Sequence, residues 1–221
     1  MIISVSNLGK RFNREWIFKG LSGEFSTGCV YAIIGPNGSG KSTLMRILWG
    51  QEPQSEGSIQ YSSVGKSIAM EETYKHISLA TPYMDLIEEL TLAEHIEFHF
   101  TFKKPLSAFN TIDILKKMDL EYAATKPIKQ FSSGMKQRLK LGLAFYSHSD
   151  VLFLDEPTTH LDQRAIEWYM ENLLEIKAKR LVFIATNQRS DYPKEAVEIN
   201  ISALKEVTKR DASSIQASSN H

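Results

Sequence analysis

Short apolar runs occur at intervals along this chain and indicate where its central strands lie. Three runs, at residues 30–34, 151–154 and 181–185, consist almost entirely of apolar residues and are followed by polar ones. Such runs are typical of strands that are covered on both faces of a parallel sheet. The pattern therefore predicts a mainly parallel central sheet.

The N-terminal part of the chain has a different pattern. Residues 2–8 and 15–25 are predicted to be antiparallel strands joined by a turn, because Ile3 and Val5 alternate with serines as in a half-buried strand. Two more short strands are predicted at residues 57–61 and 76–80.

Between about residues 83 and 148, the apolar positions change to the helical period. Thr91 and Glu94 have the spacing of a capping box, which predicts a helix that begins there and runs through Phe100. Further helices are predicted at about residues 111–118, after Ser132-Ser133-Gly134, and at about residues 163–179.

Composition narrows the class of protein. The 221 residues include 26 Lys and Arg and 26 Asp and Glu, so the formal net charge is zero and no nucleic-acid partner is expected. The single cysteine, Cys29, cannot form an internal disulfide and suits a reducing compartment. No signal peptide and no window of eighteen apolar residues is present, which predicts a soluble, cytoplasmic protein. The polar residues 206–221 predict a flexible tail.

A glycine-rich segment that follows the run at 30–34 is the strongest candidate for chemistry. Glycines let the chain curl so that successive N–H groups converge on an anion, and the next helix adds a partial positive charge. Lys41 would supply a full positive charge to bind the β- and γ-phosphates, and Ser42 would offer a hydroxyl to Mg²⁺. The segment that fits this phosphate-loop pattern is Gly35, Pro36, Asn37, Gly38, Ser39, Gly40, Lys41, Ser42 and Thr43.

Two adjacent acids end the apolar run at 151–154. The carboxyl end of a parallel strand is where ligands bind in open α/β sheets, so Asp155 would hold Mg²⁺, directly or through water. Glu156 would orient an attacking water or accept its proton. With the phosphate loop upstream, a merely solvated acidic loop is the weaker interpretation.

In this order and spacing, the motifs resemble those of the nucleotide-binding domain of ABC transporters over nearly the whole chain. Residues 35–43 match the Walker A motif, and Asp155-Glu156 matches Walker B with its catalytic glutamate. Leu161-Asp162 resembles the D-loop. The family signature, usually Leu-Ser-Gly-Gly-Gln, resembles Phe131, Ser132, Ser133, Gly134 and Met135.

The resemblance also implies how the site is completed. Phe12 lies where the family places an adenine-stacking aromatic, although Trp16 could stack instead, or both could belong to the core. Ser132 and Gly134 open a helix that can receive an anion, a geometry that an ordinary helix cap shares. In the family this anion is the γ-phosphate on the other protomer, which implies a homodimer or a pair with another nucleotide-binding domain.

Four positions depart from the family pattern. Pro82 stands where the family has a glutamine that touches Mg²⁺ and the attacking water, and it has no side-chain oxygen. Asn187 replaces a histidine that contacts the γ-phosphate, and it can donate a hydrogen bond but cannot be cationic. Ser133 and Met135 replace the usual Gly and Gln of the signature. These replacements predict that this chain hydrolyses ATP more slowly than is usual for the family.

The resemblance implies an α/β P-loop fold of the ABC type, with a core of about residues 1–82 and 149–205 and a helical subdomain of about residues 83–148. It implies an ATPase that uses ATP and Mg²⁺ to drive a separately encoded membrane permease from the cytoplasmic side. The signature is similar to that of exporter-type subunits, including the cytochrome c biogenesis ATPase. A non-transport ABC ATPase and a slow ATP-dependent switch module remain as alternatives.

Overall fold

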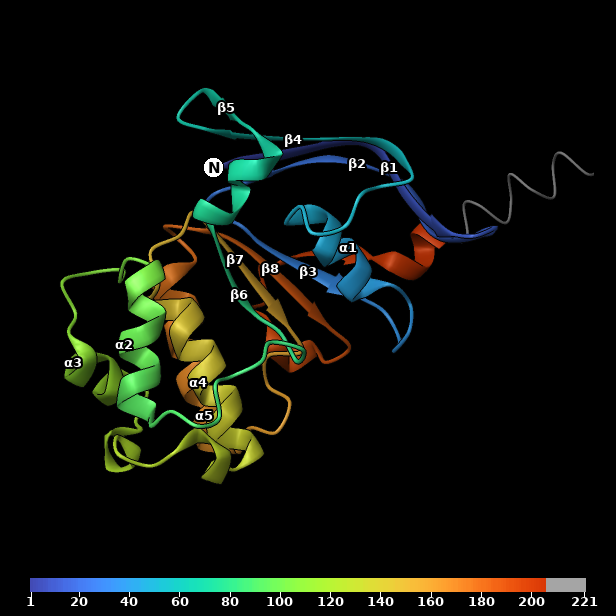
Figure 1. Ribbon diagram of the computed structural model, residues 1–221. Helices are drawn as coiled ribbons and strands as arrows, with labels where there is room; N and C mark the ends of the chain where they lie inside the picture. Colours follow the sequence, from blue (N-terminus) through green and yellow to red (C-terminus); the bar gives the residue numbers. More distant parts are fainter. Residues whose placement is uncertain (206–221) are drawn as a thin grey trace, which may run out of the picture.

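Two sheets form the framework of the computed structural model, which describes residues 1–205 (Figure 1). The antiparallel sheet, in the order β2-β1-β4-β5, contains β1 (Ile2–Phe12), β2 (Glu15–Ser26), β4 (Glu56–Ser63) and β5 (Lys66–Ile68). The parallel sheet, in the order β6-β7-β8-β3-β9, contains β3 (Val30–Ile34), β6 (Ile77–Ala80), β7 (Val151–Asp155), β8 (Leu181–Thr186) and β9 (Val197–Asn200). This arrangement confirms the predicted α/β class.

Helix α1 (Lys41–Leu48) lies between the two sheets (Figure 1). Its apolar face is buried, and Leu44 and Met45 belong to the same hydrophobic cluster as Ile3 of β1 and Phe153 of β7. Burying a side chain of this size stabilises the fold by about 1.5–3 kcal/mol. The packing therefore fixes the start of α1, and with it the phosphate loop, at the end of β3.

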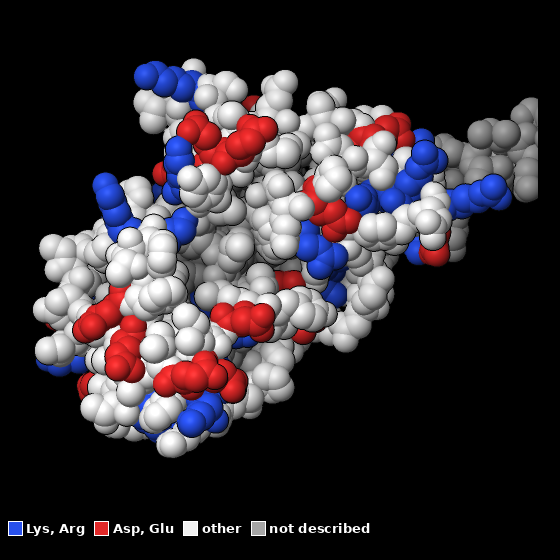
Figure 2. Space-filling view, viewed as in Figure 1, with Lys and Arg blue, Asp and Glu red and all other residues white. Residues whose placement is uncertain are grey.

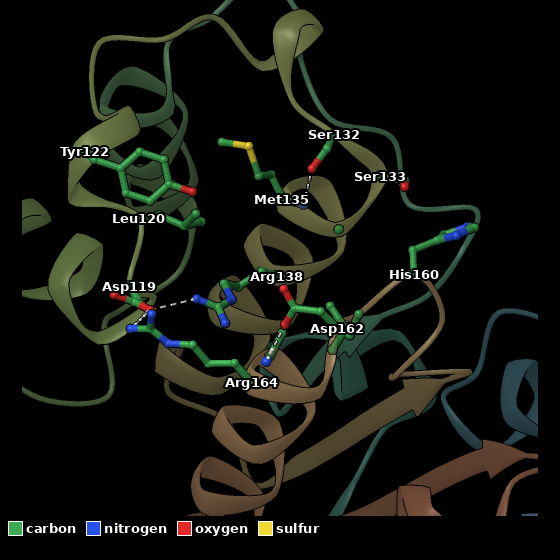
Figure 3. A pocket seen from close by; sticks show the side chains of 13 residues that line it. Asp119, Leu120, Tyr122, Ser132, Ser133, Met135, Arg138, His160, Asp162 and Arg164 are labelled. Atoms are coloured by element: carbon green, nitrogen blue, oxygen red, sulfur yellow. Dashed lines mark hydrogen bonds and ion pairs between the residues drawn. The ribbon is translucent and has the colours of Figure 1, made fainter.

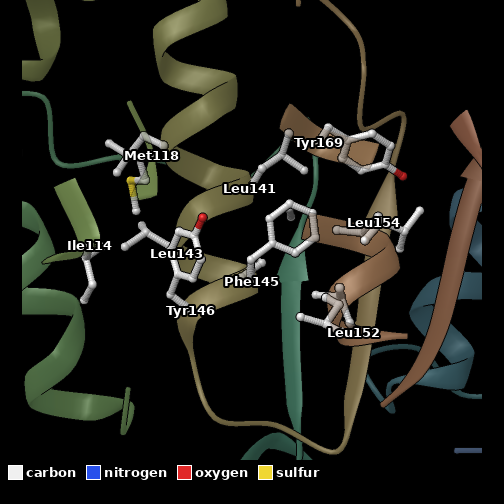
Figure 4. Close-up of a cluster of buried hydrophobic side chains, with 14 of the residues drawn as sticks. Ile114, Met118, Leu141, Leu143, Phe145, Tyr146, Leu152, Leu154 and Tyr169 are labelled. Atoms are coloured by element: carbon white, nitrogen blue, oxygen red, sulfur yellow. The ribbon is translucent and has the colours of Figure 1, made fainter. Parts of the chain in front are cut away.

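The remaining α-helices lie on the other face of the parallel sheet. In Figure 4, Leu141 and Phe145 lie against Leu152 and Leu154 of β7, and all four side chains are fully buried. Tyr169, Ile114 and Met118 extend this cluster toward the neighbouring helices. These helices are α2 (Leu92–Phe102), α3 (Thr111–Lys117), α4 (Ser133–Tyr146) and α5 (Gln163–Ile176).

The predicted capping box is confirmed at the start of α2. The Thr91 hydroxyl accepts a hydrogen bond from the Glu94 N–H (3.3 Å), and the Glu94 carboxylate accepts one from the Thr91 N–H (2.8 Å). Residues 83–90 form a loop rather than the beginning of the helical region. The division into a core and a helical subdomain stays a prediction, and the proposed tail lies outside the described residues.

Two strands were not predicted from the pattern. Both β5 and β9 are short and largely exposed, so they lack the apolar periodicity that identifies a strand. Within residues 1–205, no helix is long and apolar enough to cross a bilayer. Figure 2 shows acidic and basic side chains interspersed over this face of the molecule.

A partly buried histidine on α2, His99, predicts a pH-dependent stability. Nε2 of His99 lies 2.8 Å from the Ser147 hydroxyl, and burial, with smaller effects of His95 and Lys103, lowers the pKa of His99 to about 4. Because an unfolded histidine titrates near 6.5, the unfolded chain binds more protons between these values, and stability falls as the pH decreases. We expect this histidine to account for a loss of about 2 kcal/mol between pH 7 and pH 5.

Thermal melts of the wild type and His99→Gln at pH 7 and pH 5 would measure this effect. The melting temperature should fall by about 5 °C more in the wild type than in the variant, each relative to its own pH 7 value. His148→Gln, which changes an exposed histidine, is the matched control and should behave like the wild type. Equal falls in wild type and His99→Gln would contradict the assignment.

Candidate functional site

The phosphate loop joins β3 to α1 and holds its lysine in place. Lys41 is buried, and its ammonium group donates hydrogen bonds to the carbonyl oxygens of Gly35 (2.9 Å) and Pro36 (3.1 Å). Gly40 has a φ of 107°, and a Cβ there would lie 2.2 Å from Cγ2 of Ile17. Only glycine fits this position, because any side chain would be both strained and in collision with Ile17.

A cavity of about 410 Å³ opens beside this loop. It brings together six of the nine predicted phosphate-loop residues and Glu156, which follows β7, as well as residues that were not predicted; Gly35, Pro36 and Ser39 do not line it. The hydroxyl of Ser39 is buried and has no hydrogen-bond partner among residues 1–205, which fits a loop shaped to bind an anion. The lining residues are Ile17, Asn37, Gly38, Gly40, Lys41, Ser42, Thr43, Arg46, Tyr83 and Glu156.

The two predicted carboxylates have different environments. Asp155 is buried at the end of β7, and burial raises the pKa of its carboxyl although a hydrogen bond with Ser42 opposes this shift. Glu156 lines the cavity. Its backbone has a φ of 48°, in the left-handed region that residues other than glycine rarely adopt. Backbone strain of this kind is characteristic of functional sites.

Two contacts hold the strained turn in place. The N–H of Glu156 donates to the carbonyl oxygen of Ala185 on β8 (2.8 Å). The amide of Gln137, on α4, donates to the carbonyl oxygen of Pro157 (2.8 Å). The direction of the Glu156 side chain is therefore set both by the sheet and by the helix that begins at the signature.

The donor set at the end of β7 fits a magnesium ion. A serine hydroxyl and a carboxylate, Ser42 and Asp155, are joined by a hydrogen bond and supply the oxygen atoms that Mg²⁺ prefers. Magnesium in nucleotide sites is held by few protein groups together with phosphate oxygens. In the described part of the chain, no group of three or more His, Cys, Asp or Glu side chains could hold a metal by itself.

Asn187 lies beside the phosphate loop although it is far from it in sequence. Its side-chain amide donates a hydrogen bond to the side-chain oxygen of Asn37 (3.2 Å). The nearby Asp191, which sequence reasoning missed, is buried and accepts hydrogen bonds from the hydroxyls of Thr158 (2.7 Å) and Thr186 (2.5 Å). Asp191 thus ties the segment after Glu156 to the segment before Asn187, and no motif in the sequence marks it.

The signature residues open α4 as expected. The Ser132 hydroxyl accepts a hydrogen bond from the Met135 N–H (3.2 Å), which is the geometry of a helix N-cap. A Cβ on Gly134 would lie 2.9 Å from the carbonyl oxygen of His160, so glycine allows the chain after β7 to pass close to the signature. Ser133 lies in the first turn of α4 between these two residues.

A second cavity, of about 670 Å³, lies over the signature (Figure 3). Asp119 forms ion pairs there with Arg138 (3.2 Å) and Arg164 (2.8 Å). Asp162, the predicted D-loop residue, lines the same cavity and also caps α5 by accepting a hydrogen bond from the Ala165 N–H (2.8 Å). The phosphate-loop cavity and the signature cavity share no lining residue.

Neither candidate for adenine stacking lines the phosphate-loop cavity. Phe12, at the end of β1, is 46% exposed, and the ammonium group of Lys10 lies 5.0 Å from its ring centroid. Trp16 is partly buried, and its ring is flanked by Arg11 (5.6 Å) and Lys19 (5.1 Å). Phe12 has the more accessible ring, so it stays our prediction for the stacking residue.

The expected position of the missing family glutamine lies in the loop after β6. Pro82 itself does not line the phosphate-loop cavity, whereas the next residue, Tyr83, does. Sequence reasoning missed Tyr83, because a single tyrosine in a polar loop belongs to no motif.

Comparison with known proteins agrees with this geometry. The family model described as "ABC transporter" matches residues 18–159. The chain is 29% identical to the uncharacterized ABC transporter ATP-binding protein YybJ of Bacillus subtilis over 191 residues, covering 86% of this chain and 87% of YybJ. It is 30% identical to the lantibiotic transport ATP-binding protein SrtF of Streptococcus pyogenes over 191 residues, covering 84% and 80%.

A solved structure has the same fold. It is described as the dimeric structure of MJ0796, a bacterial ABC transporter cassette, and it superposes with a TM-score of 0.71 at 24% identity. The match covers 84% of this chain and 88% of the cassette.

Proposed function

Because the chain belongs to the ABC transporter family of ATP-binding proteins, we propose that it binds Mg-ATP in a head-to-tail dimer and hydrolyses it to drive a separately encoded membrane permease. One observation carries the dimer. The phosphate loop and the signature line two cavities with no residue in common, so each cavity can supply half of a nucleotide site. The MJ0796 cassette, which has this fold, is described as dimeric.

The proposed binding step uses the backbone and Lys41. The N–H groups of the phosphate loop and of the start of α1 receive the phosphates, and Lys41 exchanges the carbonyl oxygens of Gly35 and Pro36 for phosphate oxygens. Ser42 and Asp155 would hold Mg²⁺, which when bound offsets negative charge on the phosphates. Phe12 would stack on the adenine ring.

The proposed hydrolysis step uses three further groups. Glu156 orients the attacking water and accepts its proton. Asn187, held beside Asn37, donates a neutral hydrogen bond to the γ-phosphate. Ser132 of the partner subunit, with the free N–H groups that follow it, receives the same phosphate from the opposite side.

The membrane role rests on the family. We propose that the chain works at the cytoplasmic face of the cell membrane, where the permease would reach it. A switch module with slow turnover is the second candidate, and the observation that favours it is the replacement of the family glutamine and histidine by Pro82 and Asn187.

Mixing two inactive variants tests the shared site. Ser132→Arg and Lys41→Ala should each lose hydrolysis alone, because every site in either homodimer lacks one half. A mixed dimer contains one site with both Lys41 and Ser132 intact, so the mixture should recover at most about a quarter of wild-type activity by random pairing. Steady-state phosphate release measures the recovery.

The control for this experiment is Ser67→Arg, which places the same side chain at an exposed serine on β5. It should retain wild-type activity. Two folded variants that show no recovery on mixing, or a Ser132→Arg chain with full activity alone, would contradict the shared site.

A further inference from the structure

Tyr83 occupies the wall of the phosphate-loop cavity next to the position of the missing family glutamine. It faces the same space as Lys41, Ser42 and Glu156. Its side chain is 80% exposed and makes no hydrogen bond within residues 1–205, so its hydroxyl is available to a ligand. A phenol O–H is a hydrogen-bond donor, and phosphate oxygens are acceptors.

Tyr83 lies in a β-turn, which restricts the direction of its side chain. The Met84 N–H donates a hydrogen bond to the carbonyl oxygen of Thr81 (3.2 Å), which makes Pro82 and Tyr83 the two central residues of the turn. Proline is favoured at the first central position because its ring fixes φ. Pro82 cannot replace the glutamine chemically, but it restricts the backbone from which Tyr83 projects.

Lys140, on α4, stabilises this turn. Its ammonium group donates hydrogen bonds to the carbonyl oxygens of Pro82 (2.9 Å) and Thr81 (3.3 Å). One helical turn earlier on α4, Lys136 forms an ion pair with Glu88, so α4 contacts the loop between β6 and α2 at two points. Because α4 begins at the signature, the same rigid helix carries both the signature and the anchor of Tyr83.

We infer that the Tyr83 hydroxyl donates a hydrogen bond to the γ-phosphate of bound ATP, and that Lys140 is the residue that positions it. This inference rests on the proposed function and names a contact that the family pattern does not contain. The contact distinguishes triphosphate from diphosphate, because ADP has no γ-phosphate for the hydroxyl to reach. The contact also connects α4, which begins at the signature, to the nucleotide through a series of contacts: Lys140 binds the Pro82 carbonyl oxygen, and Pro82 precedes Tyr83.

Nucleotide titrations of the full chain with Mg²⁺ test the role of Tyr83. The probes are ADP and the non-hydrolysable analogue β,γ-imido-ATP, measured for the wild type and Tyr83→Phe. The preference for triphosphate over diphosphate should fall about tenfold in Tyr83→Phe, as expected for one lost hydrogen bond to a charged group, while ADP affinity stays unchanged. Tyr74→Phe removes the hydroxyl of another exposed tyrosine and should leave the preference as in the wild type.

The positioning role of Lys140 has its own readout. Lys140→Met should reproduce the loss of triphosphate preference with unchanged ADP affinity, and Lys140→Arg, which can still donate to the two carbonyls, should restore most of it. In the double variant Tyr83→Phe/Lys140→Met the loss should not exceed that of Tyr83→Phe alone, because both changes remove one contact. A purely structural role would instead lower the affinity for both nucleotides.

The outcomes separate this inference from the function on which it rests. An unchanged triphosphate preference in Tyr83→Phe, with both nucleotides still bound, overturns the inference and leaves the proposed ATPase intact. A wild-type chain that binds neither nucleotide overturns both. If the losses of triphosphate preference in Tyr83→Phe and Lys140→Met simply add in the double variant, Lys140 does not act through Tyr83.

Discussion

Replacing Lys41 with alanine should abolish tight ATP binding while the chain remains folded. In the structure, the buried ammonium group of Lys41 donates hydrogen bonds to the carbonyl oxygens of Gly35 and Pro36 in its own loop, whereas the apolar cluster that includes Leu44 and Met45 packs between the two sheets and is left in place by the substitution. With ATP bound, we propose that the same group supplies a full positive charge among the phosphates. Each hydrogen bond to a charged group is worth about 1.5–3 kcal/mol, so affinity should fall at least about a hundredfold.

Calorimetric titration with Mg-ATP measures this loss, and circular dichroism establishes that the variant is folded. Lys66→Ala, at an exposed lysine on β5, is the matched control and should bind ATP as the wild type does. A folded Lys41→Ala chain with unchanged affinity would mean that the phosphate loop does not bind the nucleotide as we propose.

Replacing Glu156 with glutamine should slow hydrolysis by about 10²–10⁴-fold and leave ATP binding in place. The amide has the size of the carboxylate but cannot accept the proton of the attacking water. The backbone of the turn should keep its shape, because the N–H of residue 156 still donates to the carbonyl oxygen of Ala185. Bound ATP should therefore persist, and with it the dimer that the nucleotide holds together.

Two measurements follow the two parts of this prediction. Phosphate release gives the rate, and light scattering with and without Mg-ATP gives the fraction of dimer. Glu171→Gln makes the same change at an exposed position on α5 and should alter neither quantity. If phosphate release is as fast in Glu156→Gln as in the wild type, another group activates the water.

Local patterns in the sequence predicted much of the fold. The apolar runs identified β3, β7 and β8, and the capping box at Thr91 marked the first turn of α2, because burial period and cap geometry are properties of a few neighbouring residues. The patterns that identified the glycine-rich loop and the two acids at the end of β7 were equally local. The structure brings Glu156 and most of the loop into one cavity, and it joins the buried Asp155 to Ser42 of the loop by a hydrogen bond.

Other features of the site depend on residues that no sequence window contains. Asn187 meets Asn37 across 150 positions of the chain, because β8 pairs with β3 in the sheet. Asp191 gains its role only when folding brings Thr158 and Thr186 to its carboxylate. These contacts depend on strand order and on side-chain packing.

By itself, the sequence determined the class of fold through the order of its apolar runs and helical segments. It also predicted the phosphate loop, the acids Asp155 and Glu156 and the signature, since each of these is a short pattern with a physical meaning of its own. Only the tertiary structure decided that Tyr83, rather than Pro82, faces the phosphate-loop cavity, and that Lys140 supports its turn from a helix 58 positions away from Pro82. The physical reason is that the direction of a side chain in a loop is set by the surfaces packed against that loop. Those surfaces come from distant segments, and they exist only once the chain has folded.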